Sequence, residues 1–158
     1  MFQSPTDVAF NLLGFPVYYY GIILAIAILI GVYCAYCLYK KFYGIEKAQN
    51  IIDFSPYIII IGILGARFYY CLVNFAYYSN HPLEIFYIRQ GGLSIHGVII
   101  IGLLALYYFS KKYRMSFFKL IDVFLCGTAL GQSIGRWGNF FNSEAFGTPT
   151  NLPWKLFI

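Results

Sequence analysis

Charged side chains are scarce in this chain. Only 11% of its 158 residues are Asp, Glu, Lys or Arg, whereas soluble domains usually carry about 25%. Hydrophobic residues make up 60% of the chain, so its polar residues are too few to cover a folded surface in water. This composition excludes an ordinary soluble domain and predicts a protein whose main solvent is lipid.

Cysteines are few, and no basic segment opens the chain. The four cysteines lie inside apolar runs, whereas a secreted disulfide framework places them in the loops of a small polar domain. Cys34 and Cys37 have CxxC spacing, but neither a second pair nor a nearby histidine completes a zinc site. We interpret all four as small apolar residues of helices. Because the N-terminus lacks a basic segment, we expect no cleavable signal peptide.

The net charge of +5 would suggest a nucleic-acid partner in a soluble protein. Here most of the positive charge lies in short loops between apolar runs, and no basic face carries interleaved aromatic residues. We therefore expect no nucleic-acid partner and interpret the basic loops as signals of membrane topology.

Four apolar segments are long enough to cross a bilayer, for which about 20 residues are needed. They are continuous runs, unlike the alternating strands of membrane β-barrels. No internal repeat or polar linker divides the chain. We therefore expect a single all-α domain, a polytopic bundle of transmembrane helices. The predicted spans are residues 18–39, 51–73, 93–110 and 117–134.

Loop charge predicts the orientation of these spans, because Lys and Arg concentrate in cytoplasmic loops. Segments 40–50 and 111–119 together hold seven of the eleven Lys and Arg residues, so we expect both in the cytoplasm. Segment 74–92 is nearly neutral, and the N-terminal arm has no Lys or Arg. We therefore expect the N-terminus, segment 74–92 and everything after Ile134 on the outer side.

Polar residues gather at the span ends that this orientation places outside, where we expect them to meet. Ionisable groups at membrane depth are energetically costly and mark functional sites by default. Each residue taken alone also has a simpler interpretation. Tyr20 could be an interfacial aromatic and Arg67 a snorkelling cation. His96 could be a packing histidine, and Glu144 a solvated loop carboxylate. The residues are Tyr20 at the first span, Arg67 and Tyr70 at the second, His96 at the third, and Arg136, Asn139, Asn142 and Glu144 after the fourth.

The segment from Gly131 to Gly147 resists such simpler interpretations. Its sequence, GQSIGRWGNFFNSEAFG, combines an arginine, two asparagines and a glutamate with four glycines and four aromatic residues. Glycines let backbone and ligand approach closely, and the planar guanidinium of Arg136 suits a phosphate. The two asparagines can donate to phosphate or glycerol oxygens. This chemistry predicts a site for an anionic headgroup at the outer face, without identifying a reaction.

Four motifs, in order along most of the chain, resemble one family. GRWGNFFNSEAFG (135–147) resembles the signature of the prolipoprotein diacylglyceryl transferases, and GGLSIHGVIIIG (91–102) is also similar. ILGARFYY (63–70) is similar to the family's glycine-arginine segment, and Tyr20-Gly21 matches in place. The resemblance implies seven helices in the bacterial cytoplasmic (inner) membrane, with the N-terminus outside. It also implies that this chain, which ends in NLPWKLFI, is truncated at the C-terminus and lacks a further functional arginine.

The resemblance implies a reaction without metal or cofactor. The diacylglyceryl group of phosphatidylglycerol, a membrane lipid, moves to the lipobox cysteine in a prolipoprotein signal peptide, a thioether forms and glycerol phosphate leaves. A free thiol has a pKa of about 8.5 and reacts as the thiolate, so His96 is the expected base. Arg136, helped by Arg67, is expected to meet the leaving anion, and Glu144 to orient Arg136 or His96. The substrate-binding group comprises Tyr20, Arg67, Tyr70, Arg136, Asn139, Asn142 and Gly147.

Two alternatives use the same residues without this chemistry. A transporter or flippase for an anionic lipid or solute would bind its cargo through the Arg and Asn residues, but it would need polar groups along a path across the membrane. The first and third spans have no charged residue at their centres. A structural envelope protein would leave the clustered Arg, Asn and Glu unexplained, so we expect the enzyme.

Overall fold

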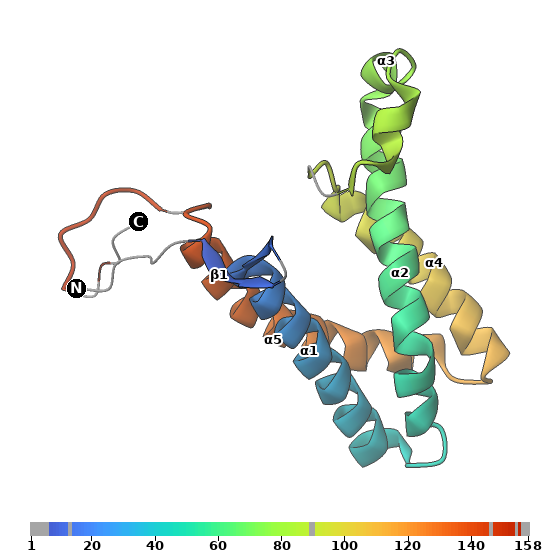
Figure 1. Cartoon of the computed structure of the whole chain (residues 1–158). Coiled ribbons are helices and arrows are strands. Elements are labelled where there is room, and N and C mark those ends of the chain that lie inside the picture. The colour runs from blue at the N-terminus through green and yellow to red at the C-terminus, as the bar shows by residue number, and fades with distance from the viewer. Residues whose placement is uncertain (1–6, 13, 89–90, 146, 154, 156–158) are drawn as a thin grey trace. The chain divides into compact units, whose positions relative to one another are not determined.

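The structure is a computed structural model that describes residues 7–12, 14–88, 91–145, 147–153 and 155. Two compact units divide the chain: one lies within residues 1–35 and 123–158, and the other is Tyr36–Asp122. The elements are β1 (Val8–Leu12), β2 (Phe15–Tyr18), α1 (Tyr19–Tyr43), α2 (Ala48–Val73), α3 (Phe75–Tyr78), a 3-10 helix η1 (Pro82–Phe86), α4 (Ile95–Lys112) and α5 (Phe117–Phe141) (Figure 1).

The helices α1, α2, α4 and α5 are long and apolar enough to cross a membrane. They coincide with the four predicted spans, which confirms the prediction of an all-α polytopic membrane protein. Each helix passes one bound of its predicted span. The extension is three residues or fewer for α2, which begins at Ala48, and for α4, which ends at Lys112, but α1 continues past Tyr39 to Tyr43 and α5 past Ile134 to Phe141. Arg136 and Asn139 therefore lie inside α5 and not, as predicted, after the end of the fourth helix.

In the unit Tyr36–Asp122, α4 packs antiparallel against α2. Glycines allow the close contact at one end, because a Cβ at position 65 would lie 2.7 Å from Cγ1 of Ile101. At the other end Phe54 and Phe109 stack with their ring centroids 5.2 Å apart. Without a hydrophobic driving force between helices in lipid, such close packing is the main source of their association.

The other unit pairs the first half of α1 with the second half of α5, and the two helices lie side by side (Figure 1). A Cβ at position 31 would lie 2.8 Å from the carbonyl oxygen of Gly127, and one at position 131 would lie 3.3 Å from that of Ala27. Residue numbers rise along one helix as they fall along the other, so the pair is antiparallel. Small residues thus bring the two backbones into contact.

A short hairpin precedes α1, and the sequence analysis did not predict it. Strands β1 and β2 pair antiparallel, with Leu12 opposite Phe15 and Val8 opposite Tyr18. The backbone N–H of Tyr19 donates to the carbonyl of Asp7 at 3.0 Å, so the hairpin leads directly into the first turn of α1. The available signal was a glycine between two short apolar runs, Gly14, whose φ is +86°.

Candidate functional site

Two of the motifs meet at one end of the α2–α4 pair. The backbone N–H of Ser94, just before α4, donates to the carbonyl of Ala66 in α2 at 3.1 Å. Gly97 is buried against the carbonyl of Gly65, and a Cβ at position 97 would lie 2.7 Å from Cβ of Tyr69. The segment GGLSIHG is therefore fixed against GARFYY by main-chain contacts that larger residues would prevent.

Arg67 donates hydrogen bonds to the backbone of the segment that connects α2 to α4. Its side chain is 6% exposed. Nη1 donates to the carbonyls of Gly91 and Gly92 at 2.9 and 3.0 Å, and Nε donates to that of Ile85 at 2.9 Å. Nη2 donates to the carbonyl of Glu84 at 2.5 Å. Four of the five guanidinium N–H groups thus hold the backbone of η1 and of the glycine pair.

The charge of Arg67 is met by carbonyl dipoles and aromatic rings. Its Cζ lies 5.9 Å from the ring centroid of Tyr70 and 5.3 Å from that of Tyr78, within cation–π range. Within the described ranges no carboxylate forms an ion pair with it. A cation in this setting remains attractive to an anion, although most of its donors are already engaged.

The glycine pair fits the space beside Arg67. Gly91 and Gly92 have φ values of +89° and +72°, in the left-handed region that other residues rarely adopt. A Cβ at position 92 would also lie 2.8 Å from Cε1 of Tyr70 and would press on the Arg67 guanidinium. Both the backbone conformation and the available space therefore require glycine at position 92.

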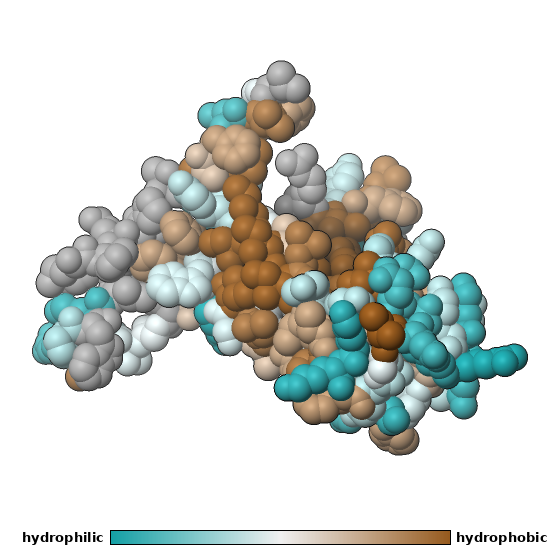
Figure 2. Space-filling view, turned by 90° about the horizontal axis from the view of Figure 1, so that it is seen from below, coloured by the Kyte–Doolittle hydropathy of each residue, from teal (hydrophilic) through white to brown (hydrophobic). Residues whose placement is uncertain are grey.

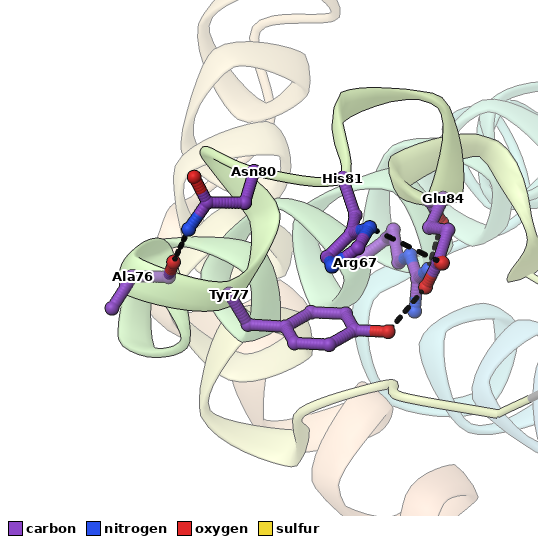
Figure 3. A network of polar contacts seen from close by, with 6 residues as sticks. All are labelled: Arg67, Ala76, Tyr77, Asn80, His81 and Glu84. Carbon is purple, nitrogen blue, oxygen red and sulfur yellow. Dashed lines mark hydrogen bonds and ion pairs between the residues drawn. The ribbon is translucent and has the colours of Figure 1, made fainter.

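A polar network surrounds Glu84, whose carbonyl accepts from Arg67 (Figure 3). Oη of Tyr77 donates to Oε2 of Glu84 at 2.8 Å, while Nδ1 of His81 lies 3.9 Å from Oε1. The hydrogen bond to this carboxylate raises the pKa of the Tyr77 phenol above its ordinary value, with desolvation and the charge of Glu84 contributing in the same direction. The Glu84 carboxylate thus holds α3 while its carbonyl accepts from Arg67.

His96, the expected base, lies in the first turn of α4. Its side chain is exposed, and its ring stacks on Tyr69 with centroids 5.9 Å apart and an interplanar angle of 25°. Neither ring nitrogen bonds to a residue that the structure describes. Tyr69 and the buried Gly97 therefore set the direction of an imidazole that stays accessible, and the sequence analysis missed the contribution of Tyr69.

In the other unit, Tyr20 packs against α5 at the signature segment. A Cβ at position 138 would lie 3.0 Å from Cδ2 of Tyr20, so the tyrosine ring lies on the helix backbone where Gly138 leaves space. Tyr19 and Phe141 stack nearby with centroids 4.7 Å apart. Tyr20 therefore contacts α5 at Gly138, within the signature segment.

The polar residues of the signature lie at and just after the end of α5. Arg136 is exposed and Asn139 half-buried. Nδ2 of Asn142 donates to Oε1 of Glu144 at 3.2 Å, so the carboxylate contacts an amide and forms no ion pair among the described residues. Gly147 is exposed. The expected role of Glu144 beside Arg136 or His96 has no counterpart in these contacts.

The predicted residues thus form one group in each unit. Arg67 and Tyr70 lie together and, through Gly91 and Gly92, adjoin the segment carrying His96. Tyr20 lies beside the helix that carries the signature arginine. No three His, Cys, Asp or Glu side chains gather as a metal site in the part of the chain that the structure describes. The convergence of both groups in one site remains a prediction.

Comparison with known proteins points to one family. The family described as prolipoprotein diacylglyceryl transferase matches residues 7–158. A Synechocystis protein is 46% identical over 99% of this chain and 55% of its own length. Proteins of Trichormus variabilis and Finegoldia magna are 45% and 42% identical, over 100% and 96% of this chain and 55% and 60% of their own lengths.

All three relatives carry the name phosphatidylglycerol–prolipoprotein diacylglyceryl transferase. This chain spans somewhat more than half their length. With a family match over almost the whole sequence and four helices able to span a membrane, this multi-pass membrane chain belongs to the prolipoprotein diacylglyceryl transferase family.

Proposed function

We propose that this chain carries part of the machinery that transfers the diacylglyceryl group of phosphatidylglycerol to the lipobox cysteine of a prolipoprotein signal peptide. In this step the thiol loses its proton, a C–S bond forms at the glycerol carbon, the C–O bond to phosphate breaks, and glycerol phosphate leaves. The observation that carries the proposal is the similarity over the whole chain to relatives with this name. A transporter is the alternative, and it would bind the lipid without forming a product.

Arg136 is the best candidate to meet the leaving phosphate. Its guanidinium is exposed and forms no ion pair within the described residues, so its planar donors are available to an anion. Arg67 differs because four of its donors already hold carbonyls. We therefore assign charge stabilisation to Arg136 and make Arg67 a positioning residue that fixes the Gly91–Gly92 backbone.

His96 is the proposed base for the cysteine thiol. Its ring is accessible, and the stack on Tyr69 limits its orientation. An imidazole nitrogen can accept the proton of a thiol as a general base. We expect His96→Gln to lower the rate of transfer about 100-fold or more, the usual contribution of acid–base catalysis. Full activity of this variant would remove His96 as the base.

The remaining residues would recognise the lipid. Asn139 and Asn142 supply amide donors at the end of α5, and Tyr20 and Tyr70 supply hydroxyl groups. Glu144 would orient the Asn142 amide, because that is the contact it makes. Gly147 would let a ligand approach the backbone. We place this chemistry at the outer face of the bacterial inner membrane with the N-terminus outside, because the basic loops are predicted in the cytoplasm.

The direct test is label transfer in membranes that contain the protein. Radiolabelled phosphatidylglycerol and a lipobox peptide are incubated with the wild type, Arg136→Ala and Lys41→Ala. Lys41 is an exposed cation on the cytoplasmic side of the predicted topology and serves as the matched control. We expect Arg136→Ala to abolish transfer and Lys41→Ala to preserve it. Wild-type binding of the lipid without label on the peptide would instead support the transporter.

A further inference from the structure

A cavity of about 460 Å³ lies at the end of the α2–α4 pair opposite to Arg67. It is formed within the unit Tyr36–Asp122, by the end of α1, the loop before α2, the loop after α4 and the start of α5. Three of its lining residues are cations, namely Lys47, Arg114 and Lys119, and one is a carboxylate, Glu46. Since α2 has 26 residues, about 39 Å separates its two ends, enough to cross a bilayer.

Two contacts join the elements that line the cavity. Nζ of Lys47 donates to the carbonyl of Arg114 at 2.5 Å, which ties the loop before α2 to the loop after α4. Nζ of Lys119 lies 4.6 Å from the ring centroid of Tyr43. The Arg114 backbone has a φ of +51°, at the turn from which its exposed side chain projects. One contact thus joins the two loops and the other joins α1 to α5.

The carboxylate of Glu46 offsets only part of the positive charge of the cavity, which three cations line. None of its three cations forms an ion pair in the described part of the chain. Asp122 lies nearby, but its carboxylate accepts from Oη of Tyr43 at 3.5 Å. An anion entering the cavity would thus meet unpaired cations, and its binding would require no salt bridge to be broken.

The rest of the cavity and its surroundings are apolar. Tyr39 and Met115, which also line it, are 3% and 7% exposed and form an aromatic and apolar base. Phe42 and Phe118 on the adjoining helices are 63% and 76% exposed. Figure 2, seen from below the view of Figure 1, shows hydrophilic side chains gathered on one part of the visible face with apolar side chains beside them. This arrangement matches a lipid, with charge at the rim and hydrocarbon beside it.

We propose that this cavity binds the headgroup of an anionic phospholipid of the cytoplasmic leaflet, with the acyl chains along the exposed phenylalanines. The site is separate from the proposed reaction centre and does not depend on transfer activity. Loop charge predicts this end of the helices in the cytoplasm, where anionic lipids attract Lys and Arg. A bound lipid would join the loop before α2 to the loop after α4 and so stabilise the α2–α4 pair at its base.

The test measures lipid preference in nanodiscs of phosphatidylcholine. Spin-labelled phosphatidic acid, which is not the proposed donor, is compared with spin-labelled phosphatidylcholine for the fraction immobilised by the protein. Arg114→Gln/Lys119→Gln removes two cations of the cavity and leaves the Lys47 contact intact. Lys41→Gln/Lys112→Gln removes two exposed cations on neighbouring helix ends that do not line it. Arg114→Lys/Lys119→Arg keeps the charge.

We expect the wild type to prefer phosphatidic acid, and the cavity variant to lose about fivefold in preference for each cation removed. The control and the charge-retaining variants should keep most of the preference. Equal losses in the cavity and control variants would show diffuse attraction to the loops and overturn the proposal, as would no preference in the wild type. Displacement of the lipid by added inorganic phosphate would assign the cavity to a soluble anion and would also overturn it.

Discussion

Replacing Arg67 by methionine tests whether this residue acts by positioning the backbone. Methionine is long and apolar, so it fills much of the same space but supplies no donor. The change would leave the four carbonyls of Glu84, Ile85, Gly91 and Gly92 without their partner. The segment should then open locally while the α2–α4 contact around Gly65 persists.

The magnitude follows from the number and exposure of these bonds. A hydrogen bond to a charged group contributes about 1.5–3 kcal/mol, but Gly91 is exposed and Glu84 and Ile85 are half-buried, so water can replace part of the loss. We estimate that Arg67→Met lowers the free energy of opening this segment by about 2–4 kcal/mol, on the order of one to two such bonds. That corresponds to a rise of roughly 30- to 1000-fold in the opening equilibrium.

Hydrogen exchange measured by mass spectrometry in nanodiscs reports this opening. The relevant amides are those of Gly91, which donates to Ile88, and of Ser94, which donates to Ala66. Both should exchange faster in Arg67→Met, less so in Arg67→Lys, and unchanged in Arg136→Met. Loss of transfer activity in Arg67→Met with wild-type exchange at both amides would refute the reasoning, because Arg67 would then act on the substrate directly.

Two further predictions concern contacts at the edges of the site. Gly138→Ala should push the Tyr20 ring away and lower the free energy of unfolding in mixed micelles by about 1–3 kcal/mol. The control Gly135→Ala should be neutral or stabilising, because its new Cβ has no neighbour within 4 Å. Equal effects of the two variants would contradict this prediction. Glu84→Gln should lower the pKa of Tyr77, because the hydrogen bond from the Tyr77 hydroxyl to the Glu84 carboxylate favours the neutral phenol. In the wild type this hydrogen bond should persist until the pH exceeds the raised pKa of Tyr77. Alkaline difference spectra against Tyr77→Phe would measure it, and an unchanged pKa would exclude this cause.

Much of the fold could be predicted from apolar runs alone, because a segment that must satisfy its backbone in lipid forms a helix. The predicted fourth span ends at Ile134, where polar residues begin, whereas the helix itself continues through Arg136 to Phe141. The hairpin was missed because it is short and precedes the first apolar run. Helix formation depends on local bonds, whereas the end of a membrane span depends on polarity, and the two need not coincide.

The candidate site was predicted as a set of residues, but several of its contacts were not. Glycines at 91 and 92 indicated a close approach, yet only the structure identifies Arg67 and Tyr70 as what approaches. The four hydrogen-bond partners of Arg67 are main-chain carbonyls, which every residue has, so the sequence does not indicate which residues they belong to. For the same reason, sequence alone suggested a substrate contact where the geometry favours a positioning role.

The product formed on the cysteine tests the proposed diacylglyceryl transfer most directly. Mass spectrometry of a lipobox peptide, incubated with phosphatidylglycerol and membranes containing the protein, should show a diacylglyceryl group on sulfur through a thioether, with one glycerol phosphate released for each peptide modified. A peptide that keeps its free thiol while the protein retains the lipid, or one that carries only a single acyl chain as a thioester, would contradict the account.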